Sequence, residues 1–257
     1  TLSSDVAQAS LMSSTWQVLS SRLGDDAEGT GLFSKFSKFE AALSASVTSP
    51  ESGTQLAALL DSANAVVTEL NSLSKLVSQQ RSEADREIAD GVKVVNKALK
   101  QIEELNGLLV GVDGSTSQAA ALMDERQRTL DTIAEYLPIE VVPREGGAID
   151  IITVEGVYLV AGKAKQLDFS PANSFGADMT LDNGALSGLT IDGQNLTPGA
   201  SSYAAVSGGM FGALFTLRDT DLPAFGAQLD TIANDLVTRL SNDSIDPTKT
   251  PGDFGLF

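Results

Sequence analysis

One stretch of the sequence, residues 53–110, constrains the fold more than any other. Apolar residues recur through it every three or four positions, which is the spacing of one face of an α-helix. The stripe consists of Leu56, Leu59, Leu60, Ala63, Val66, Val67, Leu70, Leu73, Leu76, Val77, Ala84, Ile88, Val92, Val95, Ala98, Leu99, Ile102, Leu105, Leu108 and Leu109. Gln80 alone interrupts it, and the segment contains no proline. The pattern predicts one very long helix.

Such a helix would be roughly 85 Å long at about 1.5 Å per residue. A typical globular helix has about 11–12 residues, so a stripe of this length is typical of a coiled coil or a long bundle. Its apolar face needs partners of similar length, supplied either by the same chain or by neighbouring copies. Gly91 weakens the helix by about 1 kcal/mol relative to alanine, which a helix of this kind tolerates.

The same three-and-four spacing predicts shorter helices elsewhere. We expect them at residues 2–23, 32–47, 117–137 and 210–240. Gly24 to Gly31 has the composition of a loop, and the residue before Pro50 disfavours the helical conformation. Because the helical spacing starts with the first residues, we expect the chain to be a fragment of a longer protein.

Between residues 139 and 205 the segments become short, β-branched and separated by turns. We expect strands at 139–142, 148–154, 157–160, 165–169, 179–181 and 189–191. The pairs Asn183-Gly184 and Asp192-Gly193 tolerate the positive φ that a type I′ hairpin turn requires. This region is predicted to be a small antiparallel β domain.

The predicted fold is therefore α+β. An elongated helical bundle or coiled-coil domain is built from both ends of the chain, residues 1–137 and 206–257. The β-rich domain, residues 138–205, is inserted between them.

Composition excludes several classes of function. The chain has no cysteine and no histidine, so it lacks the residues of Ser-His-Asp, Cys-His and typical zinc chemistry. Its formal charge of −17 disfavours binding to nucleic acid or to an anionic membrane. No apolar run reaches the length of a membrane span, and the first residues do not resemble a signal peptide. We expect no catalytic residue, no cofactor and no metal.

Three groups of charged residues still have a functional alternative. Asp124 and Arg126 are either catalytic or a polar pair at the junction between bundle and β domain, and we favour the polar pair. Arg218-Asp219 either binds an anion or forms an ion pair or a cap at a helix start, and we favour the ion pair or cap. The third group comprises Glu83, Glu87 and Asp90. It either binds a cation or forms a solvated helix face beside Arg81 and Arg86, and we favour the solvated face.

Other motifs have a plain structural interpretation. The segments 182–184 and 192–195 carry oxygens like those of a calcium loop, but they lack its ligand spacing and its distal glutamate, which favours turns. The stripe of Phe33, Phe36 and Phe39 is either a partner groove or core, and core is favoured. Gly208 to Gly212 lacks the Gly-Lys-Ser/Thr of a phosphate loop.

Two blocks of sequence together resemble a known family. The first has the pattern Leu-x-Asp-x-Arg in a helix, followed by Gly-x-x-Leu-Val-x-Gly. The second has Gly-Gly-x-x-Gly-x-Leu, then Arg-Asp-x-x-Leu-Pro and Leu-Asp-x-Ile/Leu-Ala. The matching positions are Leu122, Asp124, Arg126, Gly156, Leu159, Val160, Gly162, Gly208, Gly209, Gly212, Leu214, Arg218, Asp219, Leu222, Pro223, Leu229, Asp230, Ile232 and Ala233. These motifs resemble the flagellar hook-associated protein 1 family, the first hook–filament junction protein of bacteria.

The resemblance implies a structural adaptor of the bacterial flagellum and not an enzyme. Such a protein joins the hook to the filament as part of a short polymeric ring and supports motility. It is extracellular, after export through the flagellar type III apparatus. The implied partners are the hook protein, the second junction protein, copies of itself, and an export chaperone bound through a terminus absent from this chain.

The resemblance covers about residues 119–236, while residues 1–110 match only in their general helical pattern and not in specific motifs. The chain has Ser241 to Ser244 where family members often carry an asparagine and a histidine, and it lacks their terminal heptad segments. Because those segments supply the axial contacts, we expect this chain to be monomeric in solution. The alternative function is an adhesin-like or scaffold binding module that presents the β domain to a protein or glycan. A hydrolase with paired carboxylates is a third, weaker alternative.

Overall fold

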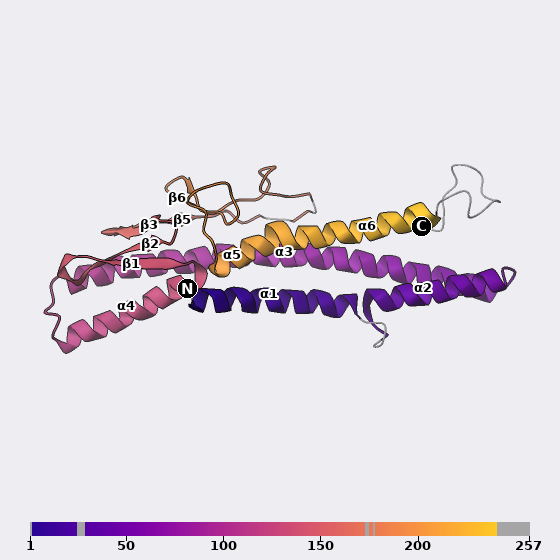
Figure 1. Cartoon of the computed structure of the whole chain (residues 1–257), viewed down its shortest axis with the longest axis horizontal. Coiled ribbons are helices and arrows are strands. Elements are labelled where there is room, and N and C mark those ends of the chain that lie inside the picture. Colours follow the sequence, from indigo (N-terminus) through magenta and orange to yellow (C-terminus); the bar gives the residue numbers. More distant parts are fainter. Residues whose placement is uncertain (1, 25–28, 173–174, 177, 241–257) are drawn as a thin grey trace. The chain divides into compact units, whose positions relative to one another are not determined.

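The computed structural model describes residues 2–24, 29–172, 175–176 and 178–240. The described chain is mostly helical with small antiparallel sheets inserted, which confirms the predicted fold class (Figure 1). Its helices are α1 Leu2–Leu23, α2 Gly31–Thr48, α3 Gly53–Leu109, α4 Ser117–Tyr136, α5 Gly209–Thr216, the π-helical turn η2 Leu217–Asp221, and α6 Leu222–Leu240. No helix among these is both long enough and apolar enough to cross a membrane.

Helix α3 has 57 residues and coincides with the predicted long helix to within one residue. Neither Gln80 nor Gly91 breaks it. Gly91 lies where the rings of Tyr136 and Phe211 pack on the helix, and a Cβ there would stand 2.7 Å and 2.8 Å from ring carbons of these residues. The glycine is therefore a packing position, because only its lack of a side chain leaves room for both rings.

The chain divides into two compact units, and α3 contributes to both. The mixed unit comprises Thr1–Ser13 and Gln80–Asp221, and the helical unit comprises Ser14–Gln79 and Leu222–Phe257. The helical unit therefore draws its bundle from segments near both ends of the chain, as predicted. The predicted domain division at residues 138 and 205 stays a prediction.

The mixed unit contains two sheets in which all pairs are antiparallel. The first has the order β1-β2-β3-β4, with β1 Ile139–Pro143, β2 Ile149–Thr153, β3 Tyr158–Ala161 and β4 Lys163–Ala164. The second has the order β5-β6-β7, with β5 Leu167–Asp168, β6 Thr190–Ile191 and β7 Gln194–Asn195. A 3-10 turn, η1 Glu145–Gly147, joins β1 to β2. Figure 1 shows β1, β2 and β3 beside the C-terminal part of α3.

The first three predicted strands are present, and those predicted at 165–169 and 189–191 are present but shorter, as β5 and β6. Asp192 and Gly193 have φ of 48° and 77° between β6 and β7, as predicted for a type I′ turn. The predicted strand at 179–181 is wrong, and Asn183-Gly184 joins no strands. The Asn183 side chain accepts from the backbone N–H groups of Thr180 and Ala185, and such local bonds compete with strand pairing.

The mixed unit has a continuous core between α3, α4, α5 and the sheets. Its fully buried side chains include Ile88, Leu99 and Ile102 of α3, so this part of the predicted stripe faces inward, whereas Leu56, Leu60, Val67 and Leu108 of the same stripe are exposed. Thr116 caps α4 by accepting from the backbone N–H of Ala119 at 3.2 Å.

The helical unit packs the first half of α3 against α1, α2 and α6. Val66 and Leu73 are fully buried, and the rings of Trp16 and Phe225 meet edge to face at 6.4 Å. Phe39 is buried but Phe33 is 51% exposed, so the predicted phenylalanine stripe is core at one end only. The buried residues of α6 are Leu222, Phe225 and Leu229, all in its first half.

Candidate functional site

The most unusual feature of the mixed unit is a buried cluster of charges around η2. The guanidinium of Arg218 is fully buried and binds Asp219 through two hydrogen bonds, Nε to Oδ1 and Nη2 to Oδ2, both 2.9 Å long. Its Nη1 donates to Oδ1 of Asp85 at 2.6 Å, and its Nη2 also donates to the Ser187 carbonyl at 2.9 Å. Arg218 therefore joins η2, α3 and the loop before β6.

Arg81, one turn before Asp85 on α3, completes the cluster. Its Nε donates to the Arg218 carbonyl at 2.9 Å, and its other nitrogens donate to the carbonyls of Gly176 and Met179. Aromatic rings cover both guanidinium groups. The ring centre of Phe215 lies 4.7 Å from Cζ of Arg218, and that of Phe175 lies 5.3 Å from Cζ of Arg81. We call Arg81, Asp85, Arg218 and Asp219 the buried quartet.

The quartet balances its own charge, because two guanidinium groups face two carboxylates. Burial raises the pKa of Asp219, and the hydrogen bonds from Arg218 oppose this shift. Burial also lowers the pKa of Arg81. Buried charges are tolerated only when they are paired and hydrogen-bonded. This arrangement suits a structural joint, because its charged atoms are directed at one another and at backbone groups.

The sequence predicted one half of the quartet and missed the other. Arg218-Asp219 forms the ion pair that was the favoured interpretation. Arg81 had been placed beside the exposed acidic face, but its side chain is buried and bonds to the Arg218 carbonyl. The available signal was the interruption of the apolar stripe at Gln80, followed by opposite charges four residues apart at Arg81 and Asp85.

Arg126 and Asp124 do not act as a pair. Arg126 is half-buried and donates to the Gly147 carbonyl at 2.6 Å, which ties α4 to η1. Burial lowers its pKa. Asp124 is exposed. The inward placing of Arg126 thus has a structural reason, while the motif role of both residues stays a prediction.

Four of the five motif glycines have a positive φ, which other residues rarely adopt, and the fifth, Gly212, lies inside α5. Gly209 has a φ of 71°, and a Cβ there would stand 2.4 Å from the Tyr136 carbonyl oxygen. Gly156 and Gly162 have φ of 88° and 73° at the ends of β3. Five of the motif's apolar positions are buried, namely Leu159, Val160, Leu214, Leu222 and Leu229, whereas Ile232 is exposed.

The remaining charged candidates are surface features. Glu83 pairs with Arg86 at 3.6 Å and Asp90 with Lys93 at 2.8 Å, both in solvent. Burial and the neighbouring Glu83 raise the pKa of Glu87. Asp192 pairs with Lys165 at 2.9 Å. Within the described ranges, no group of acidic residues is arranged to hold a metal ion.

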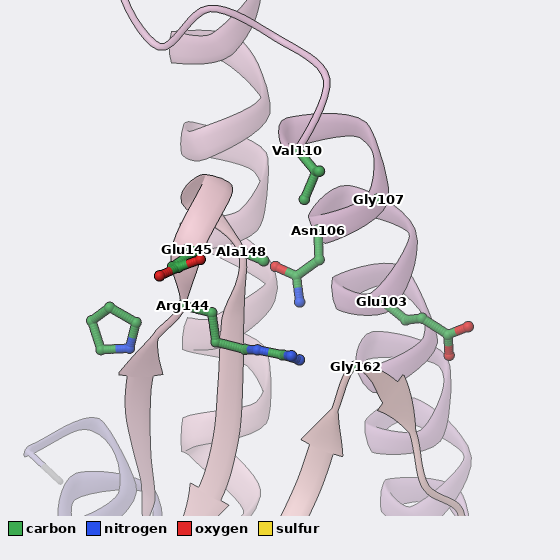
Figure 2. A pocket seen from close by; sticks show the side chains of 9 residues that line it. Glu103, Asn106, Gly107, Val110, Arg144, Glu145, Ala148 and Gly162 are labelled. Carbon is green, nitrogen blue, oxygen red and sulfur yellow. The ribbon is translucent and has the colours of Figure 1, made fainter.

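A cavity of about 620 Å³ lies at the C-terminal end of α3 (Figure 2). Its lining includes Glu103 and Asn106 of α3 and Val110 just after it, together with Arg144 and Gly162 from the sheet turns. Arg144 Nη1 donates to Asp150 at 3.2 Å, and the Asn106 amide is bonded to the backbone of Ile149. Asn106 thus holds the sheet to the helix, while Arg144 holds the turn to β2.

Comparisons with known proteins agree with one another. A family model described as the helical domain of the flagellar hook-associated protein FlgK matches residues 18–244. The flagellar hook-associated protein 1 of Escherichia coli strain K12 is 23% identical over 198 residues, which are 75% of this chain and 34% of that protein. The solved flagellar hook junction protein FlgK from Burkholderia pseudomallei has a TM-score of 0.69 at 18% identity. That match covers 91% of this chain and 41% of the other, so this chain spans well under half the length of either relative.

Proposed function

This chain belongs to the family of the flagellar hook-associated protein FlgK helical domain, and from that membership we propose that it is the helical part of an adaptor joining hook to filament. The family is a structural, non-enzymatic component of the extracellular flagellum. The observation that carries the proposal is the family match over residues 18–244, nearly the whole described chain.

The adaptor works as part of a short ring between hook and filament. Its partners are the hook protein, the second junction protein and copies of itself. An export chaperone binds a segment outside this chain, and export proceeds through the flagellar type III apparatus. Residues 138–205 form the inserted β domain on the outside of the ring.

Two physical features support a structural role. Helix α3 continues for 57 residues without a break, which suits a part that transmits force along its axis. One exposed face of its first half carries Leu56, Leu60 and Val67, which are 43%, 51% and 37% exposed. The face continues through Asn64, Asn71 and Ser74 without a charged residue. In a chain with a formal charge of −17, such a face lets another protein approach without like-charge repulsion.

The test is an in-frame deletion of codons 18–244 in the source bacterium. The adaptor proposal predicts that the cells keep their hooks, carry no filaments in electron micrographs, and release filament protein into the medium. Full-length protein supplied from a plasmid restores filaments. A plasmid copy with the exposed Lys93→Met change restores them equally and serves as the control. Normal filaments on the deletion strain would contradict the proposal.

A further inference from the structure

Five side chains of α3 bind the backbone of the segment 149–179 in reverse order along the helix. As the segment runs forward, its backbone meets helix residues of decreasing number. The contacts are Asn106 with Ile149, Glu103 with Ala164, Asn96 with Leu167, Asp85 with Ala172, and Arg81 with Gly176 and Met179. Figure 2 shows the upper end of this series, where Asn106 faces the strand that begins after Ala148. We call these five residues the polar ladder.

The two asparagines act as substitutes for a neighbouring strand. Asn106 donates to the Ile149 carbonyl at 2.7 Å and accepts from the Ile149 N–H at 3.1 Å. Asn96 binds Leu167 in the same way, at 2.9 Å and 2.8 Å. A side-chain amide carries both a donor and an acceptor, so it can satisfy both backbone groups of one residue. A carboxylate of the same shape can only accept.

The sheets alone specify the path of this segment weakly. Strands β4, β5, β6 and β7 have two residues each, and short strands with few pairs are prone to slip in register. The helix has a fixed rise per residue, so its side chains present partners at fixed positions. A slip of one residue would break the ladder's bonds together and leave backbone groups without partners.

The buried quartet locks the end of the ladder. Asp85 accepts from Ala172 N–H at 2.7 Å while it pairs with Arg218, and Arg218 also binds the Ser187 carbonyl. The hydrogen bonds of Arg81, Asp85 and Arg218 are therefore all made only when the segment lies in this place. Buried ionic groups of this kind are best known for fixing one register among alternatives.

We propose that the polar ladder on α3 is the template that sets the position and register of residues 149–172, 175–176 and 178–179. Under this inference the two-residue strands β4 and β5 do not hold their arrangement by their own pairing. The inference is independent of the flagellar function proposed above.

The test uses the full chain with Asn96→Asp and Asn106→Asp together. Each change keeps the side-chain shape and removes the donor. Hydrogen exchange measured by mass spectrometry is expected to accelerate about tenfold or more for backbone amides in 149–169, with the helical amides of α4 unchanged. The matched control is Asn64→Asp with Asn71→Asp, the same substitutions on exposed positions of the same helix, which should leave these amides unchanged.

The single variants locate the effect and keep the test valid if the double variant does not fold. Asn106→Asp should release mainly the amides of β1 and β2, and Asn96→Asp mainly those around β5. Unchanged exchange in 149–169 would overturn the proposal. So would a uniform acceleration through α4, because that would show a general loss of stability and not the release of a templated segment.

Discussion

At the residue scale, the absence of a single Cβ atom at Gly209 is required for the local packing. Its positive φ and its contact with the Tyr136 carbonyl both exclude a side chain. We predict that Gly209→Ala lowers the free energy of unfolding by about 3 kcal/mol or more, because the added Cβ meets backbone that cannot move aside. Urea denaturation followed by circular dichroism measures it.

Gly184→Ala is the matched control for this prediction. Gly184 has a nearly equal φ of 73°, but a Cβ there would meet nothing within 4 Å. It should cost about 1 kcal/mol, the strain of the left-handed conformation alone. Equal losses in the two variants would show that the close contact with Tyr136 has no energetic consequence.

Glu103 provides a pH prediction. The hydrogen bond from Lys100 lowers the pKa of Glu103, and the bond from the Ala164 N–H lowers it further. Because the folded pKa lies below the unfolded one, the associated stability is present above the ordinary carboxyl pKa and is lost as pH falls through the lowered value. Lys100→Met should move the pKa back toward the ordinary value in a carboxyl NMR titration. Lys93→Met, which removes the partner of Asp90, should leave the Glu103 pKa unchanged.

At this scale the sequence predicts a residue's conformation where its immediate neighbours determine it. It does not predict a side chain's partner where that partner is distant in the chain. The Asp192-Gly193 turn could be predicted, because its conformation follows from its own two residues. The bond from Arg81 to the Arg218 carbonyl joins residues 137 apart, and no periodicity reports such a pairing. Asn96 and Asn106 were missed for the same reason, since their partners lie in another segment.

At the scale of elements, the stripe of α3 makes a quantitative prediction. Leu70 and Leu73 lie at its centre in the helical unit, 9% and 0% exposed. Leu70→Asp with Leu73→Asp should lower the free energy of unfolding by more than about 3 kcal/mol, because two carboxylates would be buried without partners. Leu60→Asp is the same substitution on the same helix at a position 51% exposed, and it should cost under about 1 kcal/mol. Thermal melts of similar midpoint for both variants would refute the packing of this stripe.

The elements differ in how well the sequence predicts them. Helices α1 to α4 follow from periodicity, because their apolar residues recur every three or four positions. The short strands do not, because their order depends on partners outside themselves. At 179–181 the residues have strand-like composition, yet Asn183 binds the backbone of Thr180 and Arg81 that of Met179, and the segment is a loop. The sequence did not predict the π-helical turn η2 either. This turn accommodates the contacts of Arg218, which depend on other segments of the chain.

At the scale of the whole molecule, charge should govern association. A formal charge of −17 makes copies repel one another, while the exposed face of Leu56, Leu60 and Val67 favours contact. At about 0.15 M salt the Debye length is about 8 Å, so charges on two copies still repel one another at close range. We therefore predict that the chain is monomeric at micromolar concentration. Light scattering should give the mass of one chain. At about 1 M salt the repulsion is screened to about 3 Å, and any association that then begins should disappear in Leu60→Asp with Val67→Asp. A tight oligomer at the lower salt concentration would contradict this prediction. It would show that attractive contacts between copies of this chain outweigh the repulsion between their charges.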